Sequence, residues 1–77
     1  MAWQTEEGFL MREFEFKNFP DAISFVEKIA GIAEEMQHHP DICIHSYNKV
    51  KVRMKTHSEN KITEKDHALA DKIDNTI

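Results

Sequence analysis

A chain of 77 residues has room for one domain with a small core, because a domain of this size buries only about 60% of the surface that its unfolded chain exposes. The formal net charge of −4 argues against nucleic-acid binding through bulk electrostatic attraction. A single cysteine excludes an internal disulfide and indicates a reducing compartment, and no apolar run is long enough to span a bilayer. We therefore expect one cytoplasmic domain over residues 1–77, with no nucleic-acid or membrane partner.

Two strands are predicted at the start of the chain. Residues 1–5 can form a short edge strand before a turn at residues 6–8. Residues 9–16 alternate, with Phe14 and Phe16 on one face and glutamates on the other, which is the period of a strand.

A helix is predicted over about residues 20–37, because apolar residues recur there at helical spacing. The positions that form its apolar face are Ala22, Phe25, Val26, Ile29, Ala33 and Met36. Asn18 is the expected N-cap, because its side chain can accept a hydrogen bond from a free backbone N–H. Pro40 is expected to end the helix, since the residue before a proline is pushed out of the helical region.

A β-hairpin is predicted next. Residues 42–47 form its first strand, Asn48 and Lys49 form its turn, and the second strand begins at Val50. The second strand alternates between an apolar face and a basic one, made of Lys49, Lys51, Arg53 and Lys55. We interpret the basic face as the solvent-exposed side of the strand, with a phosphate-binding stripe as the alternative.

The last predicted element is a helix that begins at Thr63. Its hydroxyl can cap the helix while Asp66, three residues on, reaches back as in a capping box. The expected apolar stripe of this helix is Ala68, Leu69 and Ile73. The order strand, strand, helix, strand, strand, helix predicts an α+β fold, with a four-stranded antiparallel sheet and both helices packed on one face.

Five histidines are the compositional feature that points to chemistry. If Tyr47 pairs with Val50 across the hairpin, the numbers of paired residues sum to about 97, and His57 lies opposite residues 39–40. The helix end that carries His38 and the strand end that carries His57 would then meet at one rim of the sheet.

Each histidine also has a simpler interpretation. His45 and His67 fit ordinary surface groups, His38 fits a favourable charge at a helix C-terminus, and His39 fits a loop residue before proline. A metal centre is a further alternative, since zinc favours histidine and cysteine. Its candidate ligands would be Glu34, His38, Asp41, Cys43 and His57, but the usual paired spacings are absent and we expect no metal.

Several of these residues follow one ordered spacing. Glu34, three residues, His38-His39-Pro40, six residues, Tyr47, nine residues, His57, eight residues and Asp66 occur in that order. This pattern resembles the signature of the pterin-4a-carbinolamine dehydratases, also known in animals as dimerisation cofactors of a homeodomain transcription factor. Further similarity lies at residues 12–19, 47–50, 56–57 and 63–66, and it runs from about residue 3 to residue 73.

The resemblance implies a four-stranded antiparallel sheet with helices on one side. It also implies a hydro-lyase, 4a-hydroxytetrahydrobiopterin dehydratase, which converts 4a-hydroxytetrahydropterin to quinonoid dihydropterin and water. The reaction recycles the tetrahydrobiopterin cofactor of the aromatic amino-acid hydroxylases, and the family requires no metal or organic cofactor. Family members assemble, so we expect a homodimer or homotetramer with a small-molecule pterin as substrate.

The family roles make His38 and His57 the catalytic acid/base pair and His39 a substrate-binding group. Histidine suits this chemistry, because it can give or take a proton near neutral pH. Glu34 is expected to bind the pterin or to orient His38, and Asp66 to hydrogen-bond a catalytic histidine. The remaining candidates, which flank the histidines and are expected to line the pocket through their backbones, are Gln37, Thr56 and Ser58.

The chain also departs from the animal members of the family. It begins near the first strand, where animal proteins carry a further helix, and Ile42 stands where they carry a tryptophan. The loop at residues 58–61 lacks a glycine that is often present, and Tyr47 is expected to be structural. Two alternative functions follow: a protein-interaction module similar to the transcriptional coactivators, or a pterin-binding protein of molybdopterin metabolism without this activity.

Overall fold

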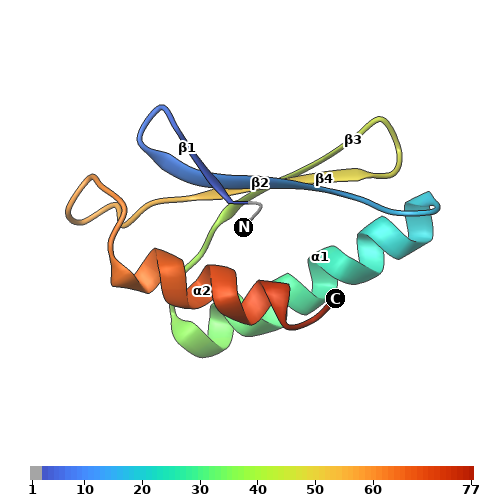
Figure 1. The fold of residues 1–77 in the computed structure, drawn as a ribbon. Coiled ribbons are helices and arrows are strands. Elements are labelled where there is room, and N and C mark those ends of the chain that lie inside the picture. The colour runs from blue at the N-terminus through green and yellow to red at the C-terminus, as the bar shows by residue number, and fades with distance from the viewer. Residues whose placement is uncertain (1–2) are drawn as a thin grey trace.

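The chain folds into a sheet layer and a helix layer, as Figure 1 shows for the computed structural model, which describes residues 3–77. In chain order the elements are β1 (Gln4–Glu6), β2 (Phe9–Glu15), α1 (Phe19–Met36), β3 (Asp41–His45), β4 (Lys49–Met54) and α2 (Glu64–Asp74). The strands form one antiparallel sheet in the order β1-β2-β4-β3, and both helices cover the same face of it. The predicted α+β fold is confirmed, although residues 1–2 of the first predicted strand lie outside the described residues.

The core lies between the sheet and the two helices. On β2 and β4, the pairs Leu10–Met54 and Phe14–Val50 lie opposite each other and are buried. The Phe14 ring packs against Phe25 of α1, with ring centroids 4.7 Å apart. Burial of such alternating apolar residues is what holds a half-exposed antiparallel sheet against its helices. No helix among residues 3–77 is both long enough and apolar enough to cross a membrane.

Both ends of helix α1 lie within one residue of the prediction, but the residue that ends it is not the predicted one. The Asn18 side chain accepts a hydrogen bond from the Asp21 N–H at 2.8 Å, as an N-cap does. At the other end, Gln37 adopts a left-handed conformation with φ of 54°, and the His38 N–H donates to the Ala33 carbonyl. This left-handed C-cap stops the helix at Met36, so the prediction that Pro40 ends it is wrong.

The hairpin between β3 and β4 differs from its prediction in turn and register. The turn consists of residues 46–48, and Ser46 and Tyr47 have φ of 51° and 57°. Asp41 pairs with Arg53, so the numbers of paired residues sum to 94. Residues 39–40 and His57 lie outside the ladder, and the predicted turn at Asn48-Lys49 and the pairing of His57 with residues 39–40 are both wrong.

Helix α2 presents a slightly different face from the predicted one. Leu69 and Ile73 are buried as expected, but Ala68 is exposed and Ala70 is buried instead. Counted from the cap at Thr63, the inward positions follow the helical spacing i, i+3, i+4 and i+7 from Asp66. The capping box of Thr63 and Asp66 is complete, which confirms that prediction.

The basic residues of β4 lie on the face of the sheet that neither helix covers. Nε of Arg53 donates to Oδ2 of Asp41 on β3 at 3.3 Å, and Nζ of Lys51 lies 3.8 Å from Oε1 of Glu6 on β1. The Arg53 guanidinium also lies 4.2 Å from the centre of the Phe9 ring. These cross-strand partners support the interpretation of the basic stripe as a solvated strand face.

Asn48 is the buried residue of the β3–β4 turn and ties it to the β2–α1 connection. It is 7% exposed, whereas its neighbour Tyr47, for which a structural role was expected, is 64% exposed. The Asn48 side-chain amide donates to the Phe16 carbonyl at 2.8 Å, and the Asn48 carbonyl accepts from the Phe16 N–H at 2.8 Å. The structural residue of this turn is therefore Asn48.

We predict that Asn48→Ala lowers the free energy of unfolding by about 1–3 kcal/mol, because it leaves the Phe16 carbonyl without its side-chain donor. Urea denaturation followed by circular dichroism measures this change. The exposed neighbour provides a matched control, since Tyr47→Ala should change stability by less than about 0.5 kcal/mol. Equal effects of the two substitutions would contradict the anchoring role of Asn48.

Candidate active site

Three segments meet at the end of the molecule opposite the β3–β4 turn. They are the C-terminal end of α1, the loop that follows β4 and the first turn of α2 (Figure 1, green and orange). Within the loop, the Thr56 N–H donates to the Lys61 carbonyl at 2.9 Å and the Asn60 N–H donates to the His57 carbonyl. The loop is therefore a closed turn that leads from β4 directly into the cap of α2.

Asp66 connects all three segments. It is fully buried, and its Oδ1 lies 2.6 Å from Nε2 of His38, which follows α1. Its Oδ2 accepts hydrogen bonds from the Thr63 N–H at 2.8 Å and from the Thr56 hydroxyl at 2.9 Å. Asp66 thus caps α2 and contacts a candidate catalytic histidine at the same time.

The protonation of Asp66 determines which nitrogen of His38 is free. Burial raises the pKa of Asp66, but hydrogen bonds from His38, the Thr63 N–H and the Thr56 hydroxyl, together with the charge of His38, outweigh burial and hold the pKa below its usual value of 3.8. An ionised carboxylate can only accept, so Nε2 of His38 donates to it. Nδ1 is then the His38 nitrogen that remains for a ligand.

The two adjacent histidines contact different helices. His38 turns toward α2, whereas Nε2 of His39 lies 2.6 Å from Oε2 of Glu34 on α1, on a surface where both side chains are more than half exposed. The left-handed conformation of Gln37 redirects the chain between α1 and these residues. The contact of Glu34 is therefore with His39, whereas the contact of His38 is with Asp66.

His57 is exposed and directly follows the buried Thr56. Its ring makes no hydrogen bond with any side chain in the described range 3–77, and Ser58 beside it is also exposed. Through Thr56 and Asp66, the start of the His57 loop is nevertheless linked to His38 by two successive hydrogen bonds. The structure brings His38 and the His57 loop to one end of the fold, with no direct bond between the two rings.

A hollow of about 460 Å³ opens beside His38, within the size range of small-molecule sites. It lies between the end of α1 and the first two turns of α2, and its lining residues are Met36, Gln37, His38, Glu64, Lys65 and Ala68. His39, His57 and Ser58 lie outside this lining. The α2 residues were missed because they are ordinary surface residues in sequence. The signal that pointed to this region was the expected hydrogen bond between Asp66 and a catalytic histidine.

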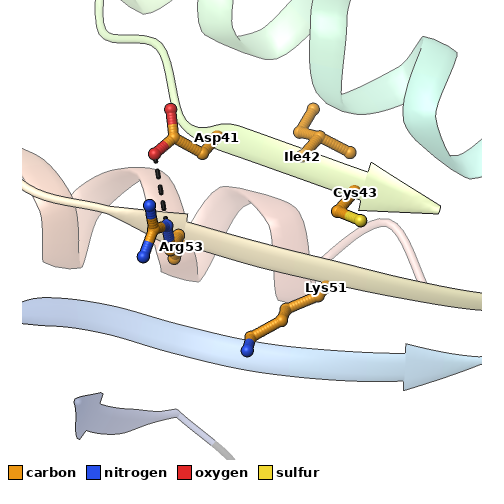
Figure 2. A pocket seen from close by; sticks show the side chains of 5 residues that line it. All are labelled: Asp41, Ile42, Cys43, Lys51 and Arg53. Carbon is orange, nitrogen blue, oxygen red and sulfur yellow. Dashed lines mark hydrogen bonds and ion pairs between the residues drawn. The ribbon is translucent and has the colours of Figure 1, made fainter. Parts of the chain in front are cut away.

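The candidate metal ligands are dispersed. Cys43 and Asp41 lie on β3, on the uncovered side of the sheet, where a hollow of about 320 Å³ is bordered by Lys51 and Arg53 of β4 (Figure 2). Asp41 is paired with Arg53 there. Among residues 3–77, no three histidine, cysteine, aspartate or glutamate side chains gather closely enough to hold a metal ion.

Comparison with known proteins identifies a family and relatives that this chain resembles. The family model described as pterin 4 alpha carbinolamine dehydratase matches residues 1–76. A protein of Sulfolobus acidocaldarius, provisionally named pterin-4-alpha-carbinolamine dehydratase, is 50% identical over 72 residues, which are 94% of this chain and 78% of that one. A protein of Herpetosiphon aurantiacus with the same provisional name is 50% identical over 73 residues, 95% of this chain and 75% of that one.

Solved structures show the same fold. The crystal structure of a transcriptional coactivator/pterin dehydratase from Brucella melitensis superposes with a TM-score of 0.88 at 38% identity, over 96% of this chain and 80% of that one. A pterin dehydratase-like protein identified as a RuBisCO assembly factor in the alpha-carboxysome superposes with a TM-score of 0.75. Its 22% identity, over 95% of this chain and 83% of that one, supports a shared fold alone. From the family match and the close relatives, the chain belongs to the pterin-4a-carbinolamine dehydratase family.

Proposed function

We propose that the protein dehydrates 4a-hydroxytetrahydropterin to quinonoid dihydropterin, as part of tetrahydrobiopterin or pterin recycling. The observation that carries this proposal is the hydrogen bond between His38 and the buried Asp66, beside a hollow of about 460 Å³, in a chain of the dehydratase family. The C4a–O bond breaks with its electron pair on oxygen, the leaving hydroxyl takes a proton, and a ring nitrogen loses one. Water is the only product lost, so no oxidant or reductant is required.

His38 is the proposed primary acid/base group. Asp66 holds Nε2–H of the ring and would stabilise the imidazolium that forms when Nδ1 takes a proton, as a buried carboxylate does for a catalytic histidine. The side chain of His38 is 12% exposed, so the ring is held by the protein while one edge stays accessible. This combination is what proton transfer at a fixed position needs.

The proposed partners of His38 differ in how firmly the protein holds them. We assign His57 as the second acid/base group, free to approach the pterin because its ring is exposed. His39, oriented by Glu34, is proposed to bind the pterin, together with the backbones of Gln37 and Ser58. The Thr56 side chain faces Asp66 and is excluded from direct contact with the substrate.

A second candidate function is a protein-interaction or pterin-binding role without dehydration. It is favoured by the relative named both transcriptional coactivator and pterin dehydratase, and by the use of this fold in a RuBisCO assembly factor. Fold alone does not determine function, so the residues of the site have to distinguish the two candidate functions. Only dehydration requires proton transfer at His38.

We also propose a cytoplasmic homodimer or homotetramer. The exposed Cys43 thiol is free, as expected in a reducing compartment, and the core is small while Phe19 and Ile23 leave apolar surface exposed on α1. Light scattering on a size-exclusion column should give a mass of two or four chains at micromolar concentration. A monomer throughout would contradict the proposed assembly.

We predict that His38→Ala and His57→Ala each lower kcat/KM for synthetic 4a-hydroxytetrahydropterin by about 10²–10⁴-fold, the usual contribution of an acid/base group. The rate is followed by the absorbance of the quinonoid product, after subtraction of the spontaneous reaction. His67→Ala, at an exposed position on α2, is the matched control and should retain wild-type activity. Full activity of His38→Ala would contradict dehydration at this site.

The ionised state of Asp66 predicts a pH dependence of stability. Because its folded pKa lies below the unfolded value of 3.8, Asp66 stabilises the fold above that value, and the contribution is lost as the pH falls through the folded pKa. Asp66→Asn should therefore lower the free energy of unfolding at neutral pH and reduce its decrease on acidification below about pH 4. Asp71→Asn, exposed on the same helix, should leave both properties unchanged. An unaltered acid profile in Asp66→Asn would show that Asp66 is not held ionised.

A further inference from the structure

Thr56 is buried, and its hydrogen bonds are made to other groups of the protein, which is unusual for a surface residue or a substrate ligand. It is 3% exposed, its N–H donates to the Lys61 carbonyl, and its own carbonyl accepts from the Glu59 N–H. Its hydroxyl donates to Oδ2 of Asp66 at 2.9 Å and lies 2.6 Å from the hydroxyl oxygen of Thr63. All its polar groups are therefore used within the protein, around the carboxylate that holds His38.

The direction of each hydrogen bond follows from the protons available. An ionised Asp66 only accepts, so the Thr56 hydroxyl gives it its single proton. The Thr63 hydroxyl must then donate to Thr56, and the Thr63 oxygen accepts from the Lys65 N–H at 3.3 Å. A directed chain of hydrogen bonds thus runs from the first turn of α2 through two hydroxyls to Oδ2 of Asp66, whose Oδ1 accepts from His38 on the other side.

We propose that Thr56 and Thr63 are positioning residues of the active site, which hold the Asp66 carboxylate in one orientation and thereby hold the His38 ring with Nδ1 free for proton transfer. The inference rests on the proposed dehydratase function and extends it to residues that do not touch the substrate. Thr56 immediately precedes His57, so the same hydroxyl also anchors the loop that carries the second imidazole. Bonds in such a chain polarise one another, so the loss of one hydroxyl affects the whole chain.

The test compares Thr56→Val, which keeps the shape of the side chain and removes the hydroxyl, with Thr56→Ser, which keeps the hydroxyl. Thr5→Val, at an exposed position on β1, is the matched control. Steady-state kinetics give kcat and KM for 4a-hydroxytetrahydropterin. Nitrogen-15 spectra of the histidine side chains, recorded where the rings are neutral, show which nitrogen of His38 carries the proton.

Thr56→Val should lower kcat by about 10-fold or more, because it removes a hydrogen bond to an ionised carboxylate, with KM changed less than about 2-fold. In the same variant, the Nε2–H tautomer of His38 should give way to a mixture. Thr56→Ser and Thr5→Val should stay within about 2-fold of wild type in kcat and keep the single tautomer. Structural damage elsewhere in the fold would leave the His38 tautomer unmixed, so the spectra separate a positioning role from a merely structural one.

Wild-type kcat with an unmixed His38 tautomer in folded Thr56→Val would overturn the inference, as would equal impairment of Thr56→Ser and Thr56→Val. If circular dichroism shows that Thr56→Val is unfolded, Thr63→Ala and Thr63→Ser take its place, with the same expected contrast and the same overturning result. If the wild-type protein converts no 4a-hydroxytetrahydropterin, the proposed function fails. The tautomer comparison then still decides whether the hydroxyls position His38.

Discussion

The ionised carboxylate of Asp66 is the constraint on which this end of the protein depends. A charge that is fully buried is tolerated only where hydrogen-bond donors replace the water it has lost. Those donors come from three places: His38 after α1, Thr56 after β4 and the N–H of Thr63 before α2. The need to satisfy one carboxylate therefore fixes how the helices and the sheet meet.

The same contacts hold His38, the proposed acid/base group. A carboxylate on Nε2 leaves Nδ1 as the nitrogen proposed to transfer the proton, and the ring, which is 12% exposed, lies beside the hollow lined by Glu64 and Lys65. His57 and His39 are more exposed than His38, and of these two only His39 has an acidic partner, Glu34. A pterin dehydratase-like protein identified as a RuBisCO assembly factor shares the fold, so the proposed dehydration depends on these side chains and not on the fold alone.

Periodicity and capping predicted the elements, because apolar spacing and the side chains of Asn18 and Thr63 act locally. They did not predict the hairpin register, since Ser46 and Tyr47 adopt positive φ without the glycine or asparagine that usually marks such a turn. For the same reason the sequence did not reveal that a left-handed Gln37 ends α1 in place of Pro40, or that His38 and His39 contact different partners. The contact between Asp66 and a histidine was expected from the family resemblance, whereas the α2 side of the hollow depends on packing between the two helices, which neither spacing nor resemblance predicted.

A crystal structure with a bound dihydropterin tests the central claim most directly. The account requires the pterin ring beside His38, with a ring atom or the 4a position within hydrogen-bonding distance of Nδ1, with the His57 loop closed toward it, and with the His38–Asp66 contact unchanged. A pterin bound elsewhere, or a complex in which Nδ1 of His38 faces away from the ligand, would contradict it.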